Sequence, residues 1–137
     1  MRQWLAPARR RRCPQCGQEM EPQRRPPVAR VDHCPACHGL WLVHGDLKQL
    51  LHARFSERAD PRAFLDAERT ELLCPDCKRP LFERRFMPRS DIRVHQCVEC
   101  AGIFLEAGKL ERLRQLVESL RPAGGAAPRR PERGRTG

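Results

Sequence analysis

The chain has 137 residues and a formal net charge of +10, but only 39% of the residues are hydrophobic and 5% are aromatic. This composition excludes a large apolar core, and no apolar run approaches the roughly 20 residues that a membrane-spanning helix needs. The positive charge is concentrated at the ends, because residues 1–12 hold five Arg and no acidic residue, and residues 121–137 hold five Arg and one Glu. The body of the chain is therefore close to neutral. We expect disordered basic arms at residues 1–12 and 122–137.

Residues 13–58 predict a first small folded unit. Short strands are expected at VARVDH (28–33) and GLWL (39–42), where apolar residues of high strand propensity cluster. An amphipathic helix should follow, because apolar residues then recur at three- and four-residue steps, at Leu47, Leu50, Leu51 and Phe55.

Residues 59–73 predict a helical linker between two units. Asp60 suits the N-cap and Pro61 the first helical position of a third helix that ends near residue 72. We expect this helix to separate the two units or to pack against one of them.

The second unit, residues 74–121, repeats the first with clearer signals. LFERRF and DIRVHQ alternate apolar and polar residues on either side of the turn MPRS, which predicts a β-hairpin. GIFL (102–105) predicts a third short strand, and a helix is expected after Gly108. Pro122 should end this helix, whose apolar positions are Leu110, Leu113, Leu116, Val117 and Leu120.

Eight cysteines form four Cys-x-x-Cys pairs, and their spacing sorts them into two sets. Seventeen residues separate the first two pairs and 19 separate the last two, both within the window of about 15–20 expected for a four-cysteine zinc site. The 36 residues between the second and third pairs lie outside that window. We therefore predict two sites with one Zn²⁺ each, the first formed by Cys13, Cys16, Cys34 and Cys37 and the second by Cys74, Cys77, Cys97 and Cys100.

The cellular location that we expect favours zinc over disulfides. The first twelve residues lack the apolar stretch of a signal peptide, which indicates a cytoplasmic protein, and thiols stay reduced in the cytoplasm. A disulfide framework and an iron or redox-switched metal site remain alternatives. Four thiolates around each ion would leave no coordination position for a substrate or a reactive water. Because no catalytic constellation occurs elsewhere in the sequence, we predict that the protein is not an enzyme and has no small-molecule substrate.

Two fourteen-residue segments, CHGLWLVHGDLKQL (37–50) and CAGIFLEAGKLERL (100–113), share one pattern. Each holds the last cysteine of a predicted site, a short strand and the start of a helix. Trp41 and Phe104 are expected in a small core, and the alternative is that their rings are exposed and stack on nucleic-acid bases. Gly39 and Gly102, like Gly17 directly after the first pair, are expected to adopt positive φ, so that backbone N–H groups can approach the thiolates. The repeat predicts one zinc-stabilised unit used twice.

These motifs resemble the pattern CPxC…CPxCxGxWLDxGEL of the bacterial transcription-factor-IIB-type zinc-finger family, a group of small zinc ribbons. The first unit is similar at CPQC and CPACHGLWLVHGDL, and the second at CPDC and CVECAGIFLEAGKL. The departures from the pattern include Val43, Asp46, Phe104, Glu106 and Lys109, and none of these is a predicted ligand. The resemblance and the order of elements predict a small zinc-stabilised α+β fold. It consists of two tandem zinc ribbons, each a short antiparallel sheet followed by an amphipathic helix.

The resemblance implies little about function beyond a link to transcription. The first possibility is a module that binds nucleic acid, with the second hairpin and the arms contacting phosphates. The second is an adaptor that docks on a larger protein machine without contacting nucleic acid, and an enzyme or a zinc or redox sensor is less favoured. The near-neutral body favours the adaptor, whereas the basic arms favour nucleic acid; no membrane partner is expected.

The candidate phosphate contacts are basic residues of the hairpin and of the first arm. They are Arg84, Arg85, Arg89 and Arg93 in the hairpin, and Arg9, Arg10, Arg11 and Arg12 in the arm. The alternative is that the hairpin arginines only protect a sheet edge from pairing and that the arms only increase solubility.

Overall fold

The strands of the two predicted units join in one antiparallel sheet. The computed structural model describes residues 10–52, 66–87 and 90–120, and seven strands in these ranges follow the order β1-β2-β3-β7-β6-β5-β4. They are β1 (Glu21–Arg25), β2 (Val28–His33), β3 (Leu40–Leu42), β4 (Glu68–Leu73), β5 (Pro80–Arg85), β6 (Arg93–Gln96) and β7 (Ile103–Leu105). Most of the two predicted arms and the first part of the predicted linker lie outside the described residues.

The repeated segments form the centre of this sheet. β3 pairs with β7, and Trp41 lies directly opposite Phe104. The expectation of two separate short sheets is therefore wrong. Within one ribbon, β3 or β7 would be an edge strand with unpaired backbone groups and three apolar side chains, and such an edge readily pairs with another strand. The two copies of the segment supply that partner to each other.

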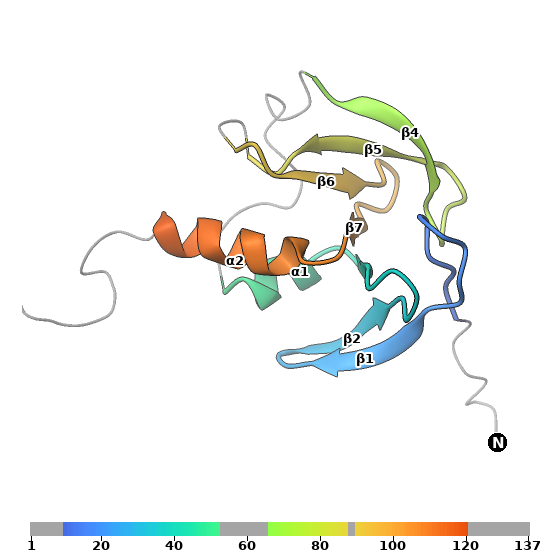
Figure 1. Cartoon of the computed structure of the whole chain (residues 1–137), viewed down its shortest axis with the longest axis horizontal. Coiled ribbons are helices and arrows are strands. Elements are labelled where there is room, and N and C mark those ends of the chain that lie inside the picture. The colour runs from blue at the N-terminus through green and yellow to red at the C-terminus, as the bar shows by residue number, and fades with distance from the viewer. Residues whose placement is uncertain (1–9, 53–65, 88–89, 121–137) are drawn as a thin grey trace, which may run out of the picture.

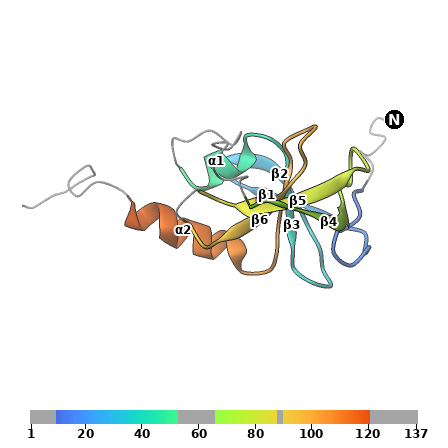
Figure 2. The ribbon, with the colours of Figure 1, turned by 90° about the horizontal axis from the view of Figure 1, so that it is seen from above.

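Alternation along these central strands separates two cores. The side chains of Leu40, Leu42, Ile103 and Leu105 belong to one buried cluster, which also contains residues of both helices. Trp41 and Phe104 project to the opposite face and pack with cysteines of both predicted zinc sites. Figures 1 and 2 place the helices at one end of the molecule and the cysteine-bearing turns toward the other.

The helices after the two ribbons differ in length. α2 (Lys109–Ser119) has eleven residues, begins after Gly108 with φ 79°, and buries Leu110 and Leu113. α1 (Asp46–Leu50) has five residues and begins after Gly45 with φ 96°. The left-handed conformation suits glycine at both positions. The predicted helix after the second ribbon is confirmed, whereas Phe55 lies outside the described residues and a matching amphipathic helix after the first ribbon stays a prediction.

The predicted helical linker is wrong where the structure describes it. Residues 68–73 form β4, which pairs with β5 through Glu68↔Glu83, Arg69↔Phe82 and Leu73↔Pro80. Thr70 adds a side-chain bond, its Oγ1 donating to the carbonyl of Leu81 at 2.8 Å. Tertiary pairing with the β5–β6 hairpin thus overrides a local preference for helix, which is a weak determinant.

The hairpins of the two ribbons differ in how well the sequence predicts them. The predicted hairpin of the second ribbon is confirmed as β5 and β6, with Phe82↔Gln96 and Arg85↔Arg93 in register. The predicted strand at residues 28–33 is confirmed as β2, but its partner β1 was not expected, because EPQRR begins with a proline-containing polar segment. β1 is one of the two edge strands of the sheet, and an edge is where a strand tolerates proline.

Candidate metal centres and basic cleft

The structure brings the eight cysteines together as the spacing predicts. Cys13, Cys16, Cys34 and Cys37 form one cluster, and Cys74, Cys77, Cys97 and Cys100 form the other, with all sulfurs of a cluster within 4.8 Å of one another. Neighbouring Sγ atoms are 3.3 Å apart for Cys16 and Cys34, and 3.8 Å apart for Cys74 and Cys100. Four sulfurs at about 2.3 Å from a tetrahedral Zn²⁺ would be about 3.8 Å from each other. Both clusters therefore fit a four-thiolate zinc site.

Each Cys-x-x-Cys pair lies in the same kind of turn, which we call a knuckle. In all four knuckles the residue after the second cysteine donates its N–H to the carbonyl of the first cysteine, at 2.8–2.9 Å. That residue has positive φ in every case: Gly17 (77°), His38 (66°), Lys78 (61°) and Ala101 (63°). Turn closure therefore places the left-handed residue directly after the pair.

The expectation of positive φ at Gly39 and Gly102 is wrong, because the left-handed residue is one position earlier in each knuckle. These glycines are required by a close approach instead. A Cβ atom on Gly39 would lie 2.6 Å from two ring atoms of Phe104, and a Cβ atom on Gly102 would overlap the ring of Trp41. Any side chain at either position would force the ring of the other ribbon to move.

Backbone N–H groups also point at the sulfurs. The N–H of Cys37 donates to Sγ of Cys34 at 3.4 Å, and the N–H of Cys77 donates to Sγ of Cys74 at 3.2 Å. In the fourth knuckle the N–H of Gly102 donates to Sγ of Cys100 at 3.4 Å. Such bonds stabilise the thiolate form that a metal needs.

The cysteines of each centre differ in the balance between burial, which raises the pKa of a thiol, and hydrogen bonds, which can lower it. Burial raises the pKa of the Cys13 and Cys74 thiols well above the usual range. At Cys34 burial also raises the pKa, but hydrogen bonds led by the N–H of Cys37 outweigh it and lower the pKa to about 7. The pKa of Cys97 is lowered in the same way. A divalent cation in each cluster would supply the positive charge that keeps the buried Cys13 and Cys74 as thiolates.

Comparison with known proteins agrees with this geometry. The family model described as a transcription factor zinc-finger, a TFIIB-type zinc ribbon, matches residues 12–53 and again residues 73–115. The chain belongs to this family. The two matched regions together span more than half of the chain, and each contains one four-cysteine cluster that can hold one zinc ion. No curated protein and no solved structure matches the chain.

In this family member the aromatic residues of the repeated segment are buried. Trp41 is 1% exposed and Phe104 is fully buried. The prediction that they form a small core is confirmed, and the alternative of exposed stacking rings is wrong.

Among the described residues, no helix is long and apolar enough to cross a membrane.

One candidate phosphate contact of the hairpin is also buried. Arg84 is 2% exposed and donates to Oε1 of Gln96 at 2.7 Å and to the carbonyl of Phe86 at 3.1 Å. Arg84 and Phe86 lie two positions apart on β5 and its continuation, and alternation directs both to the helix side of the sheet. The prediction that Arg84 contacts nucleic acid is therefore wrong.

The other hairpin arginines are partly neutralised. Arg85 and Arg93 both pair with Asp66, at 3.0 and 2.8 Å, and their side chains are 42% and 32% exposed. Arg89 lies outside the described residues, as does Arg9 of the arm. The second hairpin thus offers less free positive charge than its sequence indicates.

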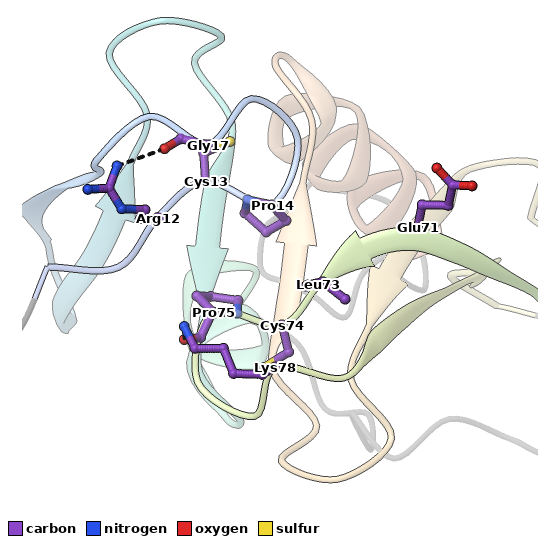
Figure 3. A pocket seen from close by; sticks show the side chains of 9 residues that line it. All are labelled: Arg12, Cys13, Pro14, Gly17, Glu71, Leu73, Cys74, Pro75 and Lys78. Carbon is purple, nitrogen blue, oxygen red and sulfur yellow. Dashed lines mark hydrogen bonds between the residues drawn. The ribbon is translucent and has the colours of Figure 1, made fainter.

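A different set of basic residues gathers between the two ribbons. Arg10, Arg11 and Arg12 lead into the first knuckle, and they line a cavity of about 480 Å³ together with Arg30, Pro75, Asp76 and Lys78. We call this cavity the basic cleft. It adjoins a smaller hollow of about 290 Å³ and shares Arg12, Pro75 and Lys78 with it. Figure 3 shows this hollow, where the turn at Cys13 and Pro14 faces the turn at Cys74 and Pro75 and the end of β4.

Two carboxylates organise the arginines of the cleft. Asp32, 1% exposed, accepts from Arg11 at 2.6 Å and from Arg30 at 3.0 Å. Asp76 accepts from the same Arg11 through both carboxylate oxygens, at 2.8 and 3.0 Å. Burial alone would lower the pKa of Arg11, but the bonds to Asp76 and Asp32 outweigh it and raise the pKa. Arg11 is thus a fixed cation that connects the two ribbons.

The cleft retains a surplus of positive charge. Arg10, Arg12 and Lys78 are exposed, and the side chains of Arg12 and Lys78 donate to the carbonyls of Gly17 and Pro75, which leave their charge uncompensated. Arg10, Arg11 and Arg12 were predicted from the sequence as phosphate contacts, whereas Arg30 and Lys78 were not among the predicted contacts. The basic residue directly after the third knuckle was a visible signal, but its proximity to the first knuckle depends on the joined sheet.

Proposed function

We propose that the protein is a zinc-stabilised module that binds nucleic acid, in association with transcription, through backbone phosphates at the basic cleft. The single observation that carries this proposal is the convergence of Arg10, Arg12, Arg30 and Lys78 from both ribbons on one cavity. Arginine and lysine side chains on one surface are the usual electrostatic footprint of phosphate recognition. In this proposal the protein has no catalytic activity and acts in the cytoplasm.

Contact with phosphates rather than bases follows from the exposed side chains. The large hydrophobic residues exposed in the described part of the chain are aliphatic: Val43, Leu73, Val98 and Leu120. Since the rings of Trp41 and Phe104 are buried, they are not available to stack on bases, which is the common mode of single-strand binding. The proposed binding therefore depends strongly on salt and weakly on sequence.

The test is a matched pair of charge reversals in the full-length protein. The cleft variant combines Arg10→Glu, Arg12→Glu and Lys78→Glu. The control combines Arg24→Glu, Arg69→Glu and Arg112→Glu, which are exposed residues outside the cleft and change the net charge by the same amount. Binding to labelled duplex DNA, single-stranded DNA and RNA is measured over a salt series.

We expect the cleft variant to bind at least about tenfold more weakly than the parent protein. On a duplex, the slope of log affinity against log salt should decrease by about 0.9 for each phosphate that the variant no longer neutralises. The control should lose much less affinity. Equal losses in both variants would mean that affinity depends only on total charge, and the proposal would then fail.

The adaptor remains the second candidate, because the hollow beside the cleft has an apolar side. Leu73 is 47% exposed there, next to Pro14 and Pro75. An adaptor that docks through this hollow should lose its protein partner on Leu73→Ser, with unchanged binding of nucleic acid. Loss of a partner in this variant, together with equal behaviour of the two charge-reversal variants, would favour the adaptor.

A further inference from the structure

We propose that the two zinc centres load as one coupled pair, so that each centre binds its ion tightly only when the other is also occupied. Tandem zinc modules can instead be independent units joined by a linker, and in that case one centre would load without regard to the other. The coupling concerns the metal sites alone and does not rest on the proposed binding of nucleic acid.

The first observation is a reciprocal exchange of aromatic rings between the ribbons. Phe104 of the second ribbon lies against Gly39 of the first, and Trp41 of the first lies against Gly102 of the second. These glycines belong to the metal sites. The carbonyl of Gly39 accepts from the N–H of Cys34 at 2.9 Å, and that of Gly102 accepts from the N–H of Cys97 at the same distance. Each ring therefore supports the backbone that holds a ligand of the other centre.

The second observation is that the centres share one core. The cluster on the face opposite the helices contains Cys13 and Cys34 of the first centre and Cys74 and Cys97 of the second. Trp41, Phe104, Met20 and Leu81 complete it, and each of them is at most 1% exposed. A unit of about 40 residues buries too little apolar surface to fold alone without a metal or a partner. Here each ribbon depends on its own metal ion and on the other ribbon as its partner.

The third observation is polar. Arg11, two positions before the first ligand, bonds to Asp76 inside the third knuckle and to Asp32, two positions before Cys34. A rearrangement of the Cys74–Cys77 turn would therefore release Asp76 from Arg11, and with it one of the contacts that hold the approach to Cys13. The pairing of β3 with β7 also couples the ribbons, because three residue pairs join them there.

These contacts make the folded state of either centre depend on the folded state of the other. A structural zinc ion contributes its binding free energy to folding, so an empty centre removes the ordered backbone on which its neighbour packs. Thermodynamic linkage makes the effect reciprocal: emptying the second centre must weaken the first by the same factor as the reverse. The basic cleft is lined by residues 10–12, which lead into the first knuckle, by Arg30, and by residues of the third knuckle. It would then form only in the doubly loaded protein; this last consequence rests on the proposed function.

The test is a zinc titration of the full-length apo protein, followed by native mass spectrometry. At one equivalent of zinc per chain, coupling predicts mainly chains with no ion and chains with two ions, and few with one. Independent centres of similar affinity would leave about half of the chains with one ion, and that result would overturn the proposal.

Variants that keep all eight cysteines locate the coupling. Phe104→Leu and Arg11→Gln are expected to raise the one-ion population, each by severalfold, because they remove contacts between the ribbons but no ligand. Lys48→Gln, at an exposed position of α1, is the control and should not change it. Unchanged one-ion populations in both contact variants would contradict the assignment of the coupling to these contacts.

Removing one centre provides a second measurement. In a Trp4→Phe background Trp41 is the only tryptophan of the chain, so its fluorescence reports on the first ribbon. Cys74→Ser with Cys77→Ser should weaken zinc binding at the first centre by at least tenfold in chelator competition, and Trp41 should lose its buried emission. Retention of one zinc ion with unchanged affinity and emission would refute the coupling. Zinc is the only ligand in these experiments, so their failure would leave the nucleic-acid proposal intact.

Discussion

The two ribbons repeat the same framework around their metal centres but carry different polar residues on it. Trp41 and Phe104, 63 residues apart in the sequence, occupy matching central positions and face each other. The next residue across the sheet is Asp32 beside Trp41 but His95 beside Phe104. Asp32 binds Arg11 and Arg30, whereas burial lowers the pKa of His95 and favours its neutral form. At this matching position the first ribbon therefore has a carboxylate that binds two arginines, whereas the second has a neutral imidazole.

The residues before the first cysteine also differ between the ribbons, being charged in the first and apolar in the second. Arg11 and Arg12 precede Cys13, whereas Leu72 and Leu73 precede Cys74. In the first ribbon the β pairing of this segment is an isolated bridge, Arg12↔Glu19, and in the second the segment is part of β4. The duplicated unit therefore keeps the positions that hold metal and core, and differs at the positions that can contact a partner.

The largest effect should come from removal of zinc, because it tests what the two ribbons share. We expect a strong chelator to abolish most of the circular dichroism signal, since each structural zinc contributes on the order of 10 kcal/mol to folding. Both ribbons should unfold together. A thermally stable apo fold, or loss of only half of the signal, would contradict a shared dependence on metal.

The next largest effect should come from the exchanged aromatic rings. Trp41→Ala and Phe104→Ala should each destabilise the zinc-loaded protein by about 3–5 kcal/mol, because each leaves a large buried cavity. Urea unfolding monitored by circular dichroism measures this. The comparison predicts similar losses for the two variants, and a large loss for only one would show that the ribbons do not support each other equally.

A smaller loss of stability should come from removing the charge of Asp32, the buried carboxylate that only the first ribbon has at this position. Asp32→Asn keeps the shape of the side chain but removes the carboxylate that Arg11 and Arg30 share. We expect a loss of about 2–3 kcal/mol, below the full penalty for a buried ion pair, because the two arginines remain partly exposed. Thermal unfolding is the measurement, and Asp91→Asn, at an exposed aspartate, is the control that should change little.

The smallest effect should come from an ion pair of the second ribbon that has no counterpart at the matching positions of the first ribbon. Glu106 accepts from Lys109 at 2.9 Å, where the first ribbon has Val43 and Asp46. The bond to Lys109 holds the pKa of Glu106 below its ordinary 4.5. The pair thus stabilises the protein above that pH, and the contribution is lost as pH falls through the lowered pKa.

Glu106→Gln should therefore cost at most about 1 kcal/mol at neutral pH. The difference from the parent protein should vanish in acid, as urea unfolding at several pH values can measure. A difference that persists in acid would mean that packing, rather than charge, accounts for the effect.

The metal sites were predictable because their information is local. Two residues between cysteines define a knuckle, and spacings of 17 and 19 residues assign the knuckles to two centres. Alternation in LFERRF and DIRVHQ predicted the β5–β6 hairpin, and the spacing of leucines predicted α2. Trp41 and Phe104 were predicted to be buried for the right reason, since an aromatic between two aliphatic residues at the join of strand and helix belongs to a core.

Other features depend on contacts between residues far apart in the sequence. Thr70 and its neighbours form β4 because β5 is available for pairing, and Arg84 is buried because the sheet directs it toward the helix side. Neither fact follows from local propensity. Arg11 and Asp76, separated by 65 residues, meet only after the two ribbons have joined.

The sequence by itself determined two zinc-binding units, their ligands and the residues of their small cores. Turn geometry and side-chain alternation depend on residues close together in the sequence, and the patterns that set them occur in both units. Only the tertiary structure decided that the units share one sheet, with each ring placed on the glycine of the other ribbon. It also decided that a cleft of positive charge lies between them, because strand edges and charges find their partners in space rather than along the chain.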